Sequence, residues 1–353
     1  MPKTSTLLLM LAFGALAPAD SHAESGLFHP ASGGGQDGFE EIAIPTRRSR
    51  TVVLDPERIA EVEAGRAESL QLNLFPDASF AARITQAGIS ALGGRFWIGT
   101  LEENASGSVS LIVRDGALTG TINTGQTLFL IRPTLDGFHR VREVDSASYA
   151  PELEPIEVSA ALEELPESFE GTDDGSNIDV LVVYTPSARD KAGGTTAIEN
   201  LIDLAVVETN QSYSNSGIGQ RLSLVDVQEV TYSEAGFNWS TTLSRLAGTS
   251  DGYMDGVHSL RDAACADAVV LIVGNTQYCG MAYLMSNVSS SFAGSAFSLV
   301  SHTCATGYYS FGHELGHNMG ARHDWYVDSS KTPWAHSHGW VNPPDRWRTV
   351  MAY

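Results

Sequence analysis

The sequence predicts two units of different fold class: a separate antiparallel β domain, followed by an α/β (α+β) domain with a mostly parallel sheet. Three observations support this prediction. Residues 47–145 form short alternating runs that are broken by Gly, Asn and Asp, and residues 151–175 carry nine acidic and no basic side chains. From residue 177 onward, near-continuous apolar runs alternate with helical patterns. This order is typical of parallel strands that are connected by helices.

The first 23 residues have the pattern of a secretory signal peptide. Lys3 precedes an apolar stretch over residues 7–16, and Ser21 and Ala23 are small residues at the two positions that a signal peptidase reads. The alternative is a short buried helix. We expect cleavage after Ala23 and therefore a secreted or periplasmic protein, with no membrane association once the signal has been removed.

Residues 24–150 are predicted to form the β-rich domain. The stretch SVSLIVRDGALTGTINTGQTLFLI, residues 108–131, alternates apolar and polar side chains, and Asp115-Gly116 in its middle predicts a hairpin turn. Residues 151–176 follow as an acidic linker. Such segments are usually solvated, so we expect a proteolytic cut between about residues 165 and 177.

The second domain, residues 177–353, is predicted to alternate strands and helices. IDVLVVYT, residues 178–185, is an apolar run suited to a central strand. Further strands are expected at residues 221–230, 266–274 and 296–302, and helices at residues 195–213, 239–247, 253–264 and 306–319.

Charge and cysteine content restrict the partners and the compartment. A net charge of −21 argues against nucleic acid, because nothing compensates phosphate repulsion. Export would permit disulfides. Cys279 and Cys304 flank a segment that is expected to return alongside itself, so we pair them, and Cys265 would be free or paired with another chain.

The stretch FGHELGHNMGARHDW, residues 311–325, predicts a metal site. In a helix, His313 and His317 lie one turn apart on one face, where both imidazoles can bind one cation. Gly320 ends the helix and lets the chain turn back, which brings in His323 as a third ligand. Three protein nitrogens that leave one position to water describe a catalytic zinc site. We expect one Zn²⁺ per chain, and a calcium site is left open.

Glu314 directly follows the first histidine of this stretch, about 100° further round the helix. Its carboxylate would lie beside the metal rather than on it. This position suits a general base that takes a proton from water activated by the metal and later passes it to the leaving group. The sequence therefore predicts a hydrolase.

These residues resemble those of a known family. HELGHNMGARHD matches the HExxHxxGxxH signature of the metzincin metallopeptidases, and Asp324 after the third histidine is similar to the reprolysin-like branch. RTVMAY, residues 348–353, looks like the Met-turn of these enzymes. The wider context from residue 177 onward is similar to bacterial peptidyl-Asp metalloendopeptidases. The resemblance implies a zinc-dependent endopeptidase, acting as a monomer on proteins or peptides, with a small irregular subdomain after Gly320.

The resemblance also implies roles for single residues. Met351 would lie under the metal as a structural residue, and Tyr353 would either support the oxyanion or serve as a packing aromatic. Gly280 and Ala282 lie in a segment similar to the sheet edge on which metzincins bind substrate as an added strand. Metzincins continue into a final helix after the Met-turn, so we expect either that the chain is truncated there or that its C-terminal part is unusually short.

Cleavage on the amino side of Asp is a further implication of the resemblance, and it requires a cation in the adjacent pocket. Arg346 and Arg348 precede the Met-turn, and Arg can bind a carboxylate through two parallel N–H bonds. Lys331 is the next candidate. The alternative is that these are ordinary exposed side chains, the usual environment of Arg.

The β domain is expected to be a propeptide that keeps a zymogen latent. No cysteine precedes Cys265, so latency would depend on a carboxylate or on blockage of the cleft rather than on a cysteine bound to zinc. Two other classes of function remain as alternatives: a catalytically weak binding or adhesion protein, and a zinc hydrolase with a non-peptide substrate. The intact Glu314 argues against the first.

Overall fold

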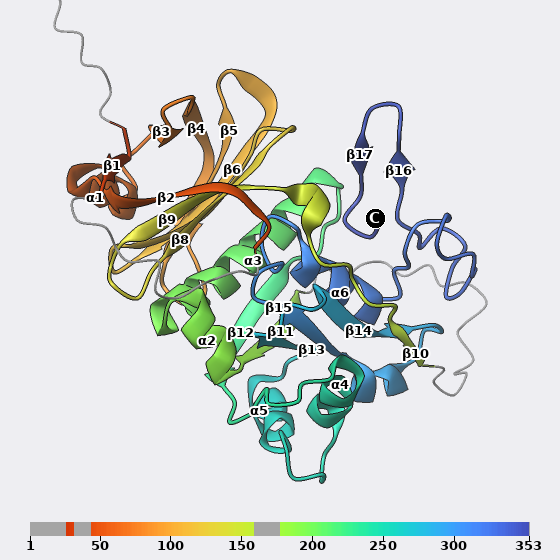
Figure 1. The fold of residues 1–353 in the computed structure, drawn as a ribbon. Helices are drawn as coiled ribbons and strands as arrows, with labels where there is room; N and C mark the ends of the chain where they lie inside the picture. Colours follow the sequence, from red (N-terminus) through yellow and green to blue (C-terminus); the bar gives the residue numbers. More distant parts are fainter. Residues whose placement is uncertain (1–25, 32–43, 159–176, 353) are drawn as a thin grey trace, which may run out of the picture.

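The computed structural model describes residues 26–31, 44–158 and 177–352. The predicted signal peptide and the expected cleavage region of the linker lie almost entirely outside these residues. The described chain contains a nine-stranded sheet, a six-stranded sheet and a two-stranded sheet. Figure 1 shows the long helix α3 (Thr195–Asn215) between the two larger sheets.

The nine-stranded sheet has the order β1-β2-β9-β8-β7-β6-β5-β4-β3, and all its neighbouring strands are antiparallel. Asp115 and Gly116, with φ angles of 50° and 74°, form the turn that joins β6 to β7. Positive φ at both central positions matches the right-handed twist of a hairpin. The strands are β1 (Phe28–Pro30), β2 (Thr46–Leu54), β3 (Ser69–Phe75), β4 (Ala78–Ile89), β5 (Arg95–Leu101), β6 (Asn104–Arg114), β7 (Ala117–Asn123), β8 (Leu128–Pro133) and β9 (His139–Val144).

The core of this unit lies on one face of the sheet. Trp97 is 1% exposed there, and helix α1 (Pro56–Glu63) adds Ile59 and Val62 to the same cluster. Asp55 caps α1, because its carboxylate accepts hydrogen bonds from the first free backbone N–H groups of the helix. A short 3₁₀ helix, η1 (Ser146–Ser148), follows β9 and leads into the second unit.

The six-stranded sheet has the order β10-β14-β15-β13-β11-β12. Neighbours are parallel except for β14 and β15, which are antiparallel. Its strands are β10 (Ile156–Val158), β11 (Ile178–Tyr184), β12 (Leu222–Glu229), β13 (Ala268–Val273), β14 (Gly280–Met285) and β15 (Phe297–Ser301). Its helices, besides α3, are α2 (Pro186–Ala192), α4 (Trp239–Ala247), α5 (Gly256–Ala264), the 3₁₀ helix η2 (Ser290–Ser295) and α6 (Ser310–Asn318).

Both faces of the six-stranded sheet are covered. Val180 and Val182 of β11 point into a cluster with α3 and α6, whereas Leu181 and Val183 point into a cluster with α4 and α5. All four side chains are fully buried. A strand that is covered on both faces needs apolar residues at every position, because successive side chains point to opposite faces.

The two larger units are in direct contact. Arg114 at the end of β6 pairs with Glu199 of α3 at 2.8 Å and also with the buried Asp203. Arg132 of β8 donates a hydrogen bond to Thr306, which lies just before α6. The β unit therefore packs against α3, which lies with α6 on the same face of the six-stranded sheet.

The predicted fold class has to be corrected. Ten of the fourteen strand pairings in the described chain are antiparallel, and only α3 among the helices exceeds nine residues. The molecule is thus mostly antiparallel β structure rather than an α/β protein with a mostly parallel sheet, and the β unit packs directly against α3. Local patterns identify strands one by one, but they do not show that α3 packs against both sheets.

The last part of the chain is irregular. After α6 the described residues contain only the two-stranded sheet of β16 (Val341–Asn342) and β17 (Trp347–Arg348). This hairpin projects from the rest of the molecule in Figure 1. After β17 the chain returns toward α6, so that Val350 lies against His313 and Met351 against Gly316 of that helix.

Candidate metal centre

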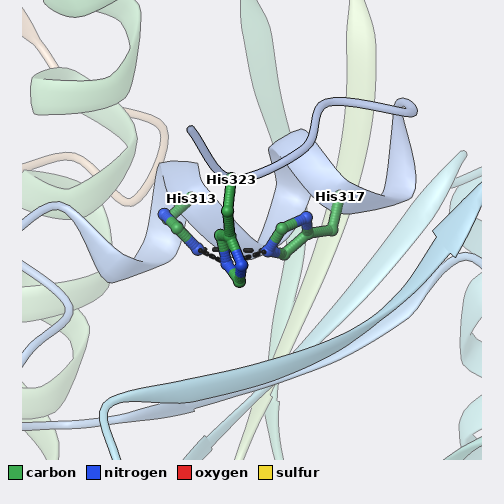
Figure 2. A group of neighbouring side chains, drawn as sticks. All are labelled: His313, His317 and His323. Atoms are coloured by element: carbon green, nitrogen blue, oxygen red, sulfur yellow. Dashed lines mark hydrogen bonds between the residues drawn. The ribbon is translucent and has the colours of Figure 1, made fainter. Parts of the chain in front are cut away.

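The three histidines of the HExxHxxGxxH stretch meet at one point. His313 and His317 lie one turn apart on α6, and His323 follows the turn after the helix (Figure 2). Their exposed fractions are 2%, 0% and 1%. Gly320 makes the return possible, because its φ is 85° and an added Cβ would lie 2.7 Å from the Pro333 ring.

The Nε2 atoms of the three rings form a triangle with sides of 3.1 Å. Two of the Nδ1 atoms face backbone carbonyls, Val350 O for His313 and Ala321 O for His317, at 2.9 and 2.8 Å. Each of these rings must place its proton on Nδ1 to donate that bond. Their Nε2 atoms then carry lone pairs, and these converge with Nε2 of His323 as the ligand atoms of one metal ion would.

This donor set fits a zinc ion. Tetrahedral zinc with Zn–N bonds of about 2.0–2.1 Å requires ligand nitrogens separated by about 3.3 Å, close to the observed triangle. Burial lowers the pKa of His313 to about 3 and also lowers that of His317 and His323. The rings are therefore neutral at pH 7, as metal ligation requires. The described residues contain this one group of His, Cys, Asp and Glu close enough to hold a metal ion.

Glu314 lies beside the triangle and is fully buried. Neither of its carboxylate oxygens has a hydrogen-bond partner among the described residues. Burial and the neighbouring Glu152 carboxyl raise its pKa above the usual range. Gly280 at the start of β14 approaches so closely that an added Cβ would lie 2.1 Å from a Glu314 oxygen. Such an unpaired buried carboxylate is costly unless it has a chemical task.

Met351 lies beneath α6. A Cβ added at Gly316 would be 2.5 Å from the Met351 sulfur, so the helix has a glycine where the methionine packs. The Val350 carbonyl accepts a hydrogen bond from His313, which links the same segment directly to the ring orientation. Tyr353, which we expected near the metal, lies outside the described residues.

The candidate cations before the Met-turn occupy different places. Arg346 is exposed in the turn between β16 and β17, with a φ of 58°. Lys331 is also exposed. Arg348 lies over the Tyr308 ring, with 5.3 Å between its guanidinium carbon and the ring centroid, and it donates to the Ala352 carbonyl. Of the three, Arg348 is thus the one beside the start of α6.

The segment around β14 is held from both sides. Cys279 and Cys304 form a disulfide that joins the start of β14 to the loop before α6, while Cys265 is exposed at the end of α5. Ala282 is fully buried and pairs with Ser298 of β15. The other edge of β14 pairs with β10, so the strand expected to receive substrate already has two neighbours.

The N-terminal part of the acidic linker is the element that sequence reasoning missed. Glu152 is only 9% exposed and contacts Glu314, and Glu154 lies 3.5 Å from Nδ1 of His323. Glu157 forms an ion pair with the buried Arg322 at 2.9 Å. The alternation of Ile156 and Val158 around Glu157 was a weak strand signal. No local signal marks Glu152 as buried.

Comparisons with known proteins agree with this geometry. Residues 174–353 match the family model described as metallo-peptidase family M12. A peptidyl-Asp metalloendopeptidase of Stenotrophomonas maltophilia strain K279a is 39% identical over 288 residues, which cover 74% of this chain and 66% of the relative. One of the same name from Xanthomonas campestris pv. campestris is 37% identical over 334 residues, covering 87% and 75%.

The chain spans 66% of the length of the relative from strain K279a and 61% of a second one, from Stenotrophomonas maltophilia strain R551-3. The matched region nevertheless includes the three histidines, Glu314 and the segment around Met351. The chain belongs to the metallopeptidase family M12.

Proposed function

We propose that the chain is a zinc-dependent endopeptidase with Glu314 as its general base. The observation that carries the proposal is the convergence of the three Nε2 atoms of His313, His317 and His323 beside the buried Glu314 carboxylate. His313, His317 and His323 would hold the ion. Zinc there supplies Lewis acidity toward water and a peptide carbonyl.

The other steps belong to the chain's own residues. Glu314 takes a proton from the attacking water and delivers it to the leaving amine, because its buried carboxylate lies beside the three histidines. The backbone of β14 orients the substrate as an added strand. Burial of the centre excludes bulk water, which strengthens each electrostatic contact made there.

Metal analysis together with a peptide assay tests this mechanism. We expect about one zinc per chain, lost in His313→Ala and His323→Ala. Glu314→Gln should retain the metal and lose hydrolysis by about 10³-fold or more, because it removes proton transfer without removing a ligand. His336→Ala, an exposed position, is the matched control. Normal hydrolysis by Glu314→Gln would contradict the mechanism.

We also propose cleavage on the amino side of Asp. The similar peptidyl-Asp metalloendopeptidases support a preference for Asp, as does Arg348 beside the start of α6. Matched peptides with Asp, Asn or Leu after the cut bond should differ, with Asp preferred by about tenfold or more. Equal cleavage of the three would reject Asp specificity. Hydrolysis of small esters without peptide hydrolysis would favour the non-peptide hydrolase, and zinc binding without hydrolysis of either would favour the binding protein.

We further propose that the β unit is an inhibitory propeptide of a secreted or periplasmic zymogen. Three contacts of the linker segment support inhibition: β10 pairs with the outer edge of β14, Leu153 N donates to Gly280 O at 3.1 Å, and Cys279 N donates to Pro151 O at 2.9 Å. The sequence of residues 1–23 supports export. A disulfide is also typical of proteins outside the cytosol. No described helix has the length and apolar character of a bilayer span.

A further inference from the structure

The Glu152 side chain occupies a defined place beside Glu314 and the three histidines. The backbone on either side of it is fixed by Cys279 and Gly280, through the Pro151 and Leu153 hydrogen bonds. Beyond this point the chain continues as β10 along the end of β14. Glu152 therefore lies in a strand-like segment beside the start of β14, with its side chain against Glu314.

Two polar groups lie next to the Glu152 carboxylate: the Ser310 hydroxyl and the Glu314 carboxyl. Ser310, the first residue of that helix, donates a hydrogen bond of 2.5 Å from its hydroxyl to one carboxylate oxygen. Ser310 is fully buried, and Glu152 is 9% exposed. The Glu152 carboxyl also interacts with the carboxyl of Glu314.

The third feature is Arg348. Its guanidinium lies over the ring of Tyr308, two residues before Ser310, and Tyr308 in turn stacks on Tyr149 with ring centroids 4.3 Å apart. Arg348 is close enough to lower the pKa of Glu152 by charge, although burial has the larger effect and raises that pKa to about 7. As a whole residue Arg348 is exposed, so it stands at the rim of the pocket.

An acid is an expensive side chain at this position. Burying a carboxylate beside a second carboxylate, Glu314, is unfavourable unless donors and cations compensate it. A leucine or glutamine would fill the same space at lower cost. The pocket nevertheless provides a buried hydroxyl and one guanidinium in a chain of net charge −21. Its donors are therefore arranged for an acidic side chain.

We propose that the pocket formed by Ser310, Tyr308 and Arg348 is the subsite that receives an acidic substrate side chain next to the cut bond, and that Glu152 fills it as an internal mimic. Only the substrate half of this proposal rests on the proposed function. Recognition of a carboxylate by the pocket can be tested without hydrolysis.

The first test empties the pocket in the full chain. Glu152→Ala removes the Cγ methylene and the carboxylate of this side chain, and propionate carries both of these groups. Millimolar propionate is expected to raise the melting temperature of this variant by several degrees, while its neutral isostere propionamide has no effect. The wild-type chain, whose pocket is filled, should respond to neither. Equal responses to propionate and propionamide would overturn the proposal.

The cation is tested in the same assay. Adding Arg348→Ala to Glu152→Ala should abolish the propionate response, whereas adding Arg346→Ala, an exposed arginine two residues away, should leave it intact. If propionate stabilises Glu152→Ala/Arg348→Ala as much as Glu152→Ala, Arg348 does not bind the carboxylate, and its assignment to the pocket is wrong.

A double-mutant cycle covers the case in which Glu152→Ala does not fold. Arg348→Ala should lower the melting temperature of the wild-type chain more than that of Glu152→Gln, because the partner charge is absent in the second background. Equal losses in the two backgrounds contradict the contact. Neither this test nor the propionate test depends on hydrolysis, so both remain decisive if the chain proves inactive.

The substrate half is tested with the active secreted form. Arg348→Ala should collapse the Asp-to-Leu cleavage ratio of matched peptides to near one, while Arg346→Ala keeps the wild-type ratio. An unchanged ratio in Arg348→Ala overturns the subsite assignment, although the zinc endopeptidase would stand. Absence of all peptide cleavage by the wild-type enzyme instead rejects the proposed function, and the propionate result separates the two failures.

Discussion

Gly280 shows at the scale of single residues how closely the edge strand approaches the catalytic carboxylate. A Cβ at this position would lie 2.1 Å from a Glu314 oxygen. The sequence indicated Gly280 only through its resemblance to a substrate-binding edge. The structure adds a steric reason for a glycine, because any larger residue would displace the proposed general base.

Gly280→Ala is therefore expected to lower kcat/KM by about 100-fold, since small displacements of a catalytic group are costly. The zinc content should be unchanged, because the substitution does not touch the three histidines. Gly256→Ala is the matched control, as an added Cβ there meets no atom within 4 Å. Wild-type activity of Gly280→Ala would show that Glu314 is not held in place by this contact.

At the scale of elements, α3 connects the two larger sheets through buried polar groups. Glu208 on α3 accepts a hydrogen bond of 2.7 Å from the Gly307 N–H, in the loop that leads to α6. Burial raises the pKa of Glu208 to about 7, an effect opposed by that hydrogen bond and by Arg132 of the β unit. The contact between the units is therefore sensitive to pH.

The direction of this pH dependence follows from the linkage between proton binding and folding. Between pH 4.5 and 7 the folded chain binds more protons at Glu208 than the unfolded chain, so the free energy of unfolding falls as pH rises. The shift corresponds to a loss of about 3 kcal/mol from this group. Glu208→Gln should remove that loss in urea titrations across this range, and the exposed Glu68→Gln should not. Identical pH profiles for wild type and Glu208→Gln would contradict this assignment.

At the scale of the whole molecule, β10 carries the acidic segment across the face of the catalytic unit. Glu157 within it pairs with Arg322, which is only 1% exposed and also pairs with Asp328 at 2.8 Å. The segment is thus attached both to the edge of the sheet and to the loop around His323. Displacing this segment would expose the edge of β14 that pairs with β10.

Ile156→Pro tests latency in the full chain. Proline removes the backbone N–H of the first residue of β10 and weakens its pairing with β14. We expect the activity of the uncleaved chain to rise by about tenfold. Position 156 lies before the expected cleavage region of residues 165–177. Once the preceding part of the chain has been removed, the wild-type and variant enzymes have identical sequences and must have equal activity. An unaltered, fully active uncleaved wild-type chain would show that the segment is not inhibitory.

The sequence alone determined the local chemistry of the site. The i, i+4 spacing of His313 and His317 and the glycine at position 320 are properties of helix geometry and of backbone freedom, so they follow from a short stretch of chain. The apolar run of β11 and the Asp115-Gly116 turn are local in the same sense. Each depends on neighbours only a few residues apart.

Tertiary structure alone decided that Glu152 is buried beside the catalytic carboxylate and how the two units contact each other. Glu152 and Ser310 are separated by 158 positions, and Arg114 and Asp203 by 89. A charged residue in an acidic run is usually solvated. Whether it is buried instead depends on the free energy of contacts between distant segments, which local periodicity does not encode. For this reason the fold class was predicted wrongly and the burial of Glu152 was not foreseen, whereas the histidine cluster was located from the sequence.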